Sequence, residues 1–322
     1  MYREPCCRVR IGTDAKYLEF NSVNKVEIEE SVKTLGNKAT LTLPRNYSKF
    51  RDKSILDLLK SGDQVSIWLG YDGDPQQEFK GYLQEIESGA PLVLHVDDEF
   101  YPFKRNTFKK AWKTITLKEL LQFVAPGLKI VCPEVNLGQF EIENASTFRV
   151  LISLQEQYGF YTSLTDGTLT CLWPFKVGMS EKTHTYTFYT PTVKNNSLKY
   201  HRADDVKVHV RATSNLRNGK KPIMYETGSK EHDSSLFEIK IPGATLDELK
   251  KFADAKLQQL CFDGYSGTIS GFGTPRTHAG DTIQIVDTEE PDRQGNYLVD
   301  SVKITYDLTQ GFERENTLSY KV

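Results

Sequence analysis

The residues of this chain that could bind a metal ion stand in two short groups of histidine and aspartate. The first is His95 with Asp97 and Asp98, and the second is His201 with Asp204–Asp205. Imidazole and carboxylate are the usual ligands of zinc, but a site needs three or four of them that converge. Alternation along a strand places His95 and Asp97 on its polar face. We therefore interpret both groups as solvated surface.

Glycine motifs give no better evidence of chemistry. Gly271–Gly273 precedes Pro275 and a strand, whereas phosphate-binding glycines open a helix. Asp72–Asp74 lacks the distal glutamate of a calcium loop. The chain has neither a Gly-x-Ser-x-Gly elbow nor a Gly-Lys-Ser/Thr motif, and no pair of carboxylates stands out by its spacing. The sequence therefore predicts no catalytic residue, no cofactor and no metal site.

Composition describes a water-soluble chain that is too long for one core. It has 322 residues, 38% of them hydrophobic, and a formal charge of -2 that gives no net attraction to nucleic acid or anionic lipid. No apolar run is long enough to cross a bilayer, and the N-terminus has no apolar signal segment. Five cysteines, two of them adjacent, do not form a disulfide framework. We expect free thiols, no membrane anchor and synthesis in a reducing bacterial cytoplasm.

One basic stretch interrupts this balance, between Phe100 and Lys118. Cations and aromatic residues alternate there: Lys104, Arg105, Lys109, Lys110 and Lys113 among Phe103, Phe108 and Trp112. Such a pattern could bind single-stranded nucleic acid. It also fits a domain junction whose lysines are solvated or meet an acidic partner. The negative net charge favours the junction, and we expect no specific nucleic-acid binding.

The most informative pattern is a repeat that occurs near both ends of the chain. A Gly-Asp turn precedes two alternating apolar residues, and a Gly-(x)-Tyr-Leu segment follows. The two copies are Gly62, Asp63, Val65, Ile67, Gly81, Tyr82 and Leu83, and Gly280, Asp281, Ile283, Ile285, Gly295, Tyr297 and Leu298. Apolar residues at every second place lie on one face of a strand. The repeat predicts two related β-modules.

If duplication produced the repeat, both Gly-Asp pairs occupy the same turn of their modules. Tyr82 and Tyr297 then lie on equivalent strands. Ile67 faces one core and Ile285 the other, together with the apolar residue two places before each.

The two copies and the segment between them divide the chain into three parts. We predict β-barrels over residues 4–105 and 206–322, with an α/β module inserted at 106–205. Two capping boxes, Thr116 with Glu119 and Thr245 with Glu248, predict helix starts, and the second begins a helix over 245–261 in the last module. Ser146 to Gly159 reads as a further helix, and residues 160–173 read as a hairpin. The predicted fold class is β-rich α+β.

The order of these segments resembles the late control D-like tail-hub proteins, which form the baseplate hub of contractile phage tails. The N-terminal hub part of type VI secretion spike proteins is similar. The matching segments are spread over nearly the whole chain: 39–44, 62–83, 146–173, 241–243 with its helix, 271–275, 280–281 and 295–299.

This resemblance implies a homotrimer in which each chain supplies two tail-tube-like β-barrels to a ring around a channel. The chain continues for only a few strands beyond the repeat, to Val322, so we expect the spike to be a separate protein. The expected partners are the tail-tube protein, that spike, and the tape-measure and baseplate proteins. The particle is the virion of a phage or prophage, or a related contractile injection system.

Two other functions stay open at this stage. A carbohydrate-active or cell-wall-degrading enzyme requires a cleft with paired carboxylates. A glycan-binding module is the other alternative, and it requires export, which the N-terminus does not support.

Overall fold

The computed structural model describes residues 3–13, 15–44, 55–173, 182–214, 222–241, 244–291 and 294–322. Residues 242–243 of the predicted 241–243 segment lie outside these residues. Strands dominate, so the β-rich α+β class is confirmed. Among the described residues, no helix is long and apolar enough to cross a membrane.

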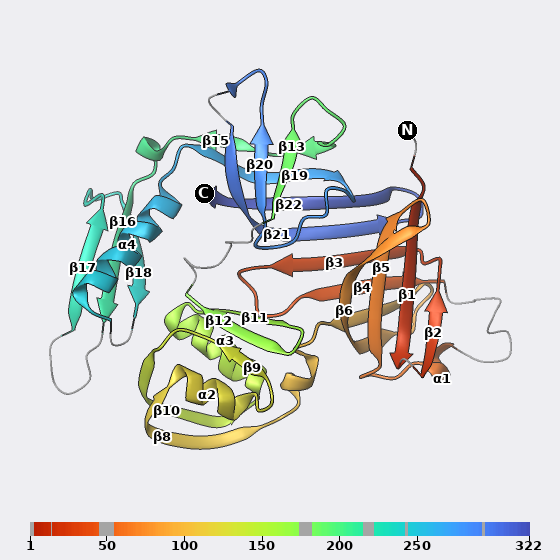
Figure 1. Ribbon diagram of the computed structural model, residues 1–322, viewed down its shortest axis with the longest axis horizontal. Helices are drawn as coiled ribbons and strands as arrows, with labels where there is room; N and C mark the ends of the chain where they lie inside the picture. Colours follow the sequence, from red (N-terminus) through yellow and green to blue (C-terminus); the bar gives the residue numbers. More distant parts are fainter. Residues whose placement is uncertain are drawn as a thin grey trace.

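The first half of the molecule consists of seven strands and a short helix. Its elements are β1 (Pro5–Thr13), β2 (Lys16–Phe20), β3 (Lys25–Ser31), β4 (Lys38–Leu43), α1 (Ile55–Leu58), β5 (Gln64–Tyr71), β6 (Asp74–Glu87) and β7 (Leu92–Asp97). Figure 1 shows β1, β2 and β5 running steeply across the direction of β3 and β4, with the long strand β6 between the two groups. Every second side chain of β3, β4 and β7, and of β5 up to Leu69, is buried, as the alternation predicts.

The second half is formed by strands from two separate parts of the chain. They are β13 (Thr183–Thr187), β14 (Asn195–Asn196), β15 (Lys199–His201), β19 (Gly264–Phe272), β20 (Thr282–Val286), β21 (Gly295–Asp307) and β22 (Gly311–Lys321). Both halves belong to one 14-stranded sheet, whose main path is β14-β19-β22-β21-β3-β4-β7-β6-β5-β1-β2. Off this path, β15 pairs with β19, β20 pairs with β21, and β13 pairs with β20. Along the described strands, no pair between β2 and β3 closes the first half into a ring.

The middle α/β module follows β7. It consists of β8 (Phe108–Thr116), α2 (Leu117–Val124), β9 (Lys129–Val131), β10 (Asn136–Ala145), α3 (Thr147–Tyr158), β11 (Tyr161–Thr165) and β12 (Thr168–Leu172). The capping box at Thr116 and the Ser146 cap of α3 are confirmed. Gly159 ends α3 in the left-handed conformation at φ 71°, which glycine adopts without the clash of a Cβ.

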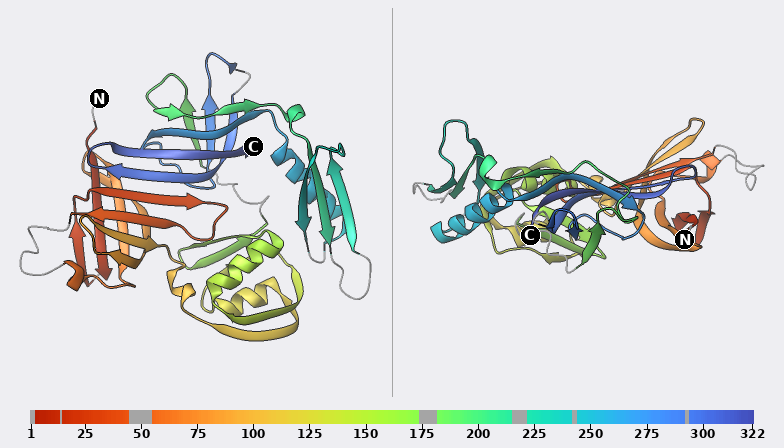
Figure 2. Two further views of the ribbon diagram at one scale, coloured as in Figure 1. Left: turned by 180° about the vertical axis from the view of Figure 1, so that it is seen from behind. Right: turned by 90° about the horizontal axis from the view of Figure 1, so that it is seen from above.

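A small α/β unit stands beside this module. It contains β16 (Val208–Ser214), β17 (Ile223–Gly228), β18 (Ser235–Lys240) and α4 (Leu246–Leu260), and α4 begins at the predicted Thr245 capping box. In the views of Figure 2 this unit and the first half lie at opposite ends of the molecule.

The observed strand pairing does not follow the predicted module boundary between residues 205 and 206. Strands β13, β14 and β15, which precede it, pair with β20 and β19 of the second half. Strand β16 and helix α4, which follow it, bury Val210, Ala212 and Leu249 in the core of the middle α/β module. Alternation shows which face of a strand is buried but not which sheet the strand joins. As folding domains, the three predicted ranges stay a prediction.

Candidate functional site

The first Gly-Asp turn is a closed hydrogen-bonded loop. Gly62 has φ 97°, its N–H donates to the Leu83 carbonyl (2.7 Å), and the Leu83 N–H donates back to the Asp63 carbonyl (2.8 Å). The Asp63 carboxylate accepts from the Lys60 N–H at 2.8 Å. The Asp63 N–H donates to the Lys60 carbonyl at 3.0 Å. Glycine takes the positive φ without strain, and aspartate bonds the backbone before it.

The second Gly-Asp turn repeats each of these contacts. Gly280 has φ 93°, its N–H donates to Val299 (2.9 Å), and the Val299 N–H donates to Asp281 (2.9 Å). The Asp281 carboxylate accepts from the His278 N–H at 2.9 Å, and the Asp281 N–H donates to the His278 carbonyl at 3.1 Å. The same donors and acceptors are joined in the same order in both turns, so the two turns have the same hydrogen-bond pattern.

Beyond the turns, the strand register shows that the two tyrosines of the repeat are offset by one residue. Val65 lies opposite Gly81, and Ile283 lies opposite Tyr297. Tyr297 therefore occupies the place of Gly81 and is fully buried, whereas Tyr82 stands one position further along and is partly exposed. The two tyrosines lie on equivalent strands, β6 and β21, but they point to opposite faces because the side-chain period of a strand is two.

The two glycines before these tyrosines consequently have different surroundings. A Cβ on Gly81 would lie 2.0 Å from the Asp97 carbonyl oxygen, which is backbone and cannot move aside. A Cβ on Gly295 would meet the flexible end of Lys321 at 2.6 Å. We predict that Gly81→Ala lowers the free energy of unfolding by about 1–3 kcal/mol through overpacking. Chemical denaturation should show a clearly smaller loss for Gly295→Ala; equal losses would contradict this difference.

A register shift at the same position is a further similarity between β6 and β21. Pairing with β7 shifts register between Leu83 and Glu85, and pairing of β21 with β22 shifts between Val299 and Ser301. In both strands the shift comes directly after the residue that is bonded to the Gly-Asp turn. A bulge bends a strand, so both halves turn their sheet at the same point.

The two halves meet where β3 pairs with the C-terminal part of β21. Ser301 lies opposite Ser31 and Lys303 opposite Glu29, and the Val32 N–H donates to the Asp300 carbonyl at 2.9 Å. This pairing makes the two halves one continuous sheet with one hydrophobic core.

A buried ion pair also joins the two halves. Glu78 of β6 and Arg314 of β22 are both buried, and Arg314 Nη2 lies 2.6 Å from Glu78 Oε1. The Arg314 Nε and Nη1 groups donate to the carbonyls of Gly273 (2.8 Å) and Thr277 (2.9 Å). Arg276 reaches the same carboxylate at 3.0 Å from a position that is 43% exposed. No feature of the sequence identified this contact in advance.

The first group considered for metal binding, His95 with Asp97 and Asp98, is in contact with protein groups instead. His95 bonds Glu87 at 2.9 Å, and Asp97 is buried and pairs with Lys104 at 2.7 Å. The expectation that Asp97 is solvated is therefore wrong, because Lys104 covers it. Asp98 accepts from the Asn37 N–H, and burial raises the pKa of its carboxyl. Among the described residues no group of three potential ligands converges.

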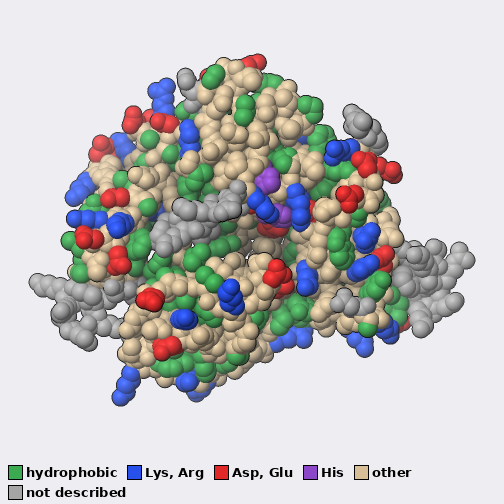
Figure 3. Space-filling view, in the orientation of Figure 1, with side chains coloured by type: hydrophobic (Ala, Val, Ile, Leu, Met, Phe, Trp, Pro, Cys, Tyr) green, Lys and Arg blue, Asp and Glu red, His purple; other side chains and the backbone are tan. Residues whose placement is uncertain are grey.

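The aromatic residues of the basic stretch pack against the chain itself. Lys104 lies over the ring of Phe148, and Lys110 lies over the rings of Trp112 and Phe123. Trp112 and Phe123 are in edge contact at 5.1 Å between centroids. Figure 3 shows acidic and basic side chains interspersed over the visible face.

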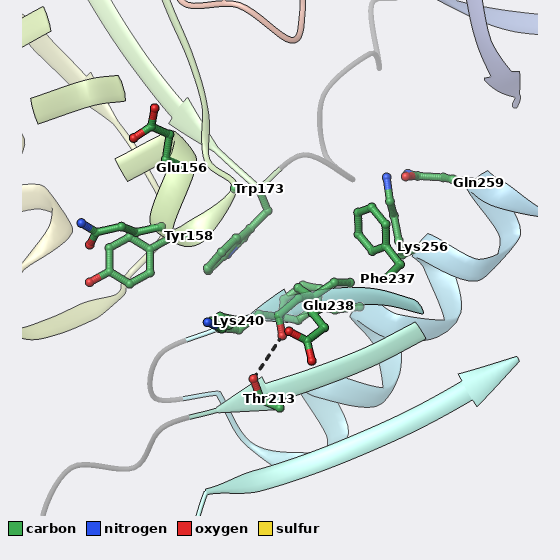
Figure 4. Close-up of a pocket in the computed structure, with 14 residues that line it drawn as sticks. Glu156, Tyr158, Trp173, Thr213, Phe237, Glu238, Lys240, Lys256 and Gln259 are labelled. Atoms are coloured by element: carbon green, nitrogen blue, oxygen red, sulfur yellow. Dashed lines mark hydrogen bonds between the residues drawn. The ribbon is translucent and has the colours of Figure 1, made fainter. Parts of the chain in front are cut away.

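A cavity of about 700 Å³ lies between α3 of the middle α/β module and the small α/β unit. Figure 4 shows Trp173 on one side of it and Phe237 with Lys256 on the other. The Lys256 ammonium lies 4.9 Å from the Phe237 ring centroid, and burial, with a smaller contribution from the charge of Lys33, lowers its pKa.

Two carboxylates of this cavity bear on the enzyme alternative. Glu156 belongs to α3 and Glu238 to β18, on opposite sides of the cavity in Figure 4. Glu238 is also paired with Arg211 at 3.2 Å. Among the described residues, they are the two carboxylates that line this cavity, and a hydrolase test should address them.

Comparison with solved structures gives the fold a counterpart, although no protein-family model and no curated protein matches the sequence. The tail protein from Neisseria meningitidis MC58 covers 98% of this chain and 96% of its own, with a TM-score of 0.65 and 15% identity. The prophage MuSo2 43 kDa tail protein from Shewanella oneidensis covers 98% of both chains, with a TM-score of 0.65 and 14% identity. The chain has the fold of a phage tail protein.

A secretion-system protein shares this tail-protein fold. The E. coli c3393 protein, described as a component of the type VI secretion system, has a TM-score of 0.56 and 9% identity over 94% of this chain and 74% of its own. The resemblance to tail-hub and secretion-system proteins is thus confirmed at the level of the fold.

Proposed function

We propose that this chain is the structural hub subunit of a contractile phage tail or a related injection system. Three copies form a ring, each supplying its first and second half, so that six similar modules surround a channel. The observation that carries the proposal is the pair of identical Gly-Asp turns at Gly62 and Gly280, on strands that have the same bulge. The shared tail-protein fold, which spans nearly the whole chain, supports it.

In this role the ring joins the tail-tube protein on one side to a separate spike protein on the other. The tape-measure and baseplate proteins are further contacts. Assembly takes place in the bacterial cytoplasm, and the mature location is the tail or injection particle. The role requires geometry and contact surfaces rather than catalysis.

The mass of the assembled chain tests the proposal. Light scattering of the chain alone at high protein concentration is expected to give three times the 36.7 kDa of one chain, and addition of the spike protein should raise this mass by the mass of the bound spike. The physical reason is that a ring of repeated modules leaves each module with two neighbours. A stable one-to-one complex of this chain with the spike would contradict the proposal.

A hydrolase assay addresses the alternative function. We expect the chain to leave purified peptidoglycan uncleaved, and Glu156→Gln and Glu238→Gln to behave like the parent chain. If the parent chain cleaved peptidoglycan and either substitution abolished the cleavage, these carboxylates would be catalytic. This result would favour the enzymatic function over the structural one.

A further inference from the structure

Each half of the molecule uses one of its sheet edges in the contact within the chain. The first half contributes β3, and the second half contributes residues 301–307 of β21. Each half also has a second sheet edge that takes no part in this contact. Among the described strands, β14 and β15 pair only with β19, and the last residues of β6 pair only with β7. Figure 1 shows β15 at the border of the sheet, beside β19.

From these edges we infer that the end of β6 in one copy pairs with β15 of the next copy, in the register of the β3–β21 contact. This inference rests on the proposed ring and names its contact between subunits. It follows from the repeat, because each remaining edge is the counterpart of an edge that is already paired within the chain.

The counterpart of the β21 edge follows from the shared bulge. Counting on from it, Ser301 and Lys303 of β21 correspond to Glu85 and Glu87 of β6. The Gln84 carbonyl at the bulge already accepts from the Ser61 hydroxyl at 2.9 Å. The pairing proposed for β6 is therefore confined to residues 85–87.

The counterpart of β3 follows from the strand registers. In the first half, the facing residues can be followed from β6 to β7 and from β7 to Leu41 of β4. In the second half, the same steps lead from β21 to β22 and from β22 to Ile269 of β19. Leu41 and Ile269 therefore occupy equivalent positions in the two halves. Val26 lies opposite Leu41, and Asn196 lies opposite Ile269. Strands β14 and β15 keep one register against β19, so the count continues from one to the other. Glu29 of β3 therefore corresponds to Lys199 of β15.

These correspondences give three facing pairs between neighbouring copies. They are Glu85 with His201, Ile86 with Tyr200, and Glu87 with Lys199. Ile86 and Tyr200 are partly buried hydrophobic residues packed against the common core, so their contact would extend it. Glu87 and Lys199 are exposed and carry opposite charges, which stabilise a cross-strand pair.

The same register puts like charges together in the wrong combinations. If a first half paired with another first half, Glu87 would face Glu29. If a second half paired with another second half, Lys303 would face Lys199. Like charges directly opposite each other destabilise a sheet. The charges therefore favour strict alternation of first and second halves around the ring.

A cross-link placed at one facing pair tests this register. Directly opposite residues of antiparallel strands have Cα atoms about 4.5–5.5 Å apart, within the range of a disulfide. The chain carrying both Glu87→Cys and Lys199→Cys, oxidised at high concentration, is expected to give covalent trimers on a non-reducing gel. A mixture of the two single variants should give covalent dimers, which shows that the bond joins different chains.

The control moves one cysteine along the same strand edge. Glu87→Cys combined with Asn195→Cys places the second thiol four residues away, about 14 Å along the strand. The yield of cross-linked product from this pair should therefore not exceed that of the single variants. The single variants also measure the background from the natural cysteines.

Light scattering on the same samples separates the possible failures. A trimer whose cysteines at 87 and 199 cross-link no more than the control pair would overturn this register and leave the proposed hub intact. A monomer at high concentration that forms no cross-link would overturn the register and the proposed ring together.

Discussion

Replacing Glu78 by Gln is expected to lower the free energy of unfolding by about 3–5 kcal/mol, because it leaves a buried cation without its anion. The Arg314 side chain is fully buried, and Glu78 is the carboxylate that it contacts. The substitution keeps the shape of the side chain and removes only its charge. Since Glu78 belongs to the first half and Arg314 to the second, the loss falls on the contact between the halves.

Arg276 provides a matched control on the same carboxylate. Its guanidinium also contacts Glu78, but its side chain is 43% exposed, and Glu78 keeps its contact with Arg314 when Arg276 is replaced. Arg276→Gln should cost about 1 kcal/mol or less. Urea denaturation of both variants checks the contrast. If Glu78→Gln and Arg276→Gln had equal and small effects, the buried pair would not hold the halves together.

Truncation of the repeated core positions is the second large effect. Ile67 and Ile285 are both fully buried, at equivalent places three residues after the first residue of β5 and of β20. Replacing either by Ala is expected to cost about 2–5 kcal/mol, because the lost side chain leaves a cavity that the sheet cannot fill.

Their neighbours Ser66 and Gln284 point to the other face of the same strands and are at least partly exposed. Ser66→Ala and Gln284→Ala should change the free energy of unfolding by about 0.5 kcal/mol or less. Denaturation curves of the four variants should fall into two groups of two. A large loss at Ile67 with none at Ile285 would show that the two positions are not equivalent.

Local patterns predicted the elements of this fold well. The capping boxes at Thr116 and Thr245 were visible in the sequence because the bonds that form them join residues three places apart. The Gly-Asp turns at Gly62 and Gly280 were visible for the same reason. Alternating apolar residues showed which face of each strand is buried.

Contacts between distant segments could not be predicted in this way. Arg314 stands in a strand among Glu313, Glu315 and Asn316, a run that reads as solvent-exposed, yet it is fully buried because Glu78 meets it from the other half. The offset between Tyr82 and Tyr297 depends on strand register. The partners of β13, β14 and β15 likewise depend on long-range pairing, which periodicity does not encode.

An electron cryomicroscopy reconstruction of the purified assembly, calculated without imposed symmetry, tests the account most directly. We predict a closed ring of three chains in which β3–β21 contacts within chains alternate with β6–β15 contacts between chains around a central channel. A dimer, an open filament, or a ring in which the Gly62 and Gly280 turns occupy unrelated positions around the channel would contradict it.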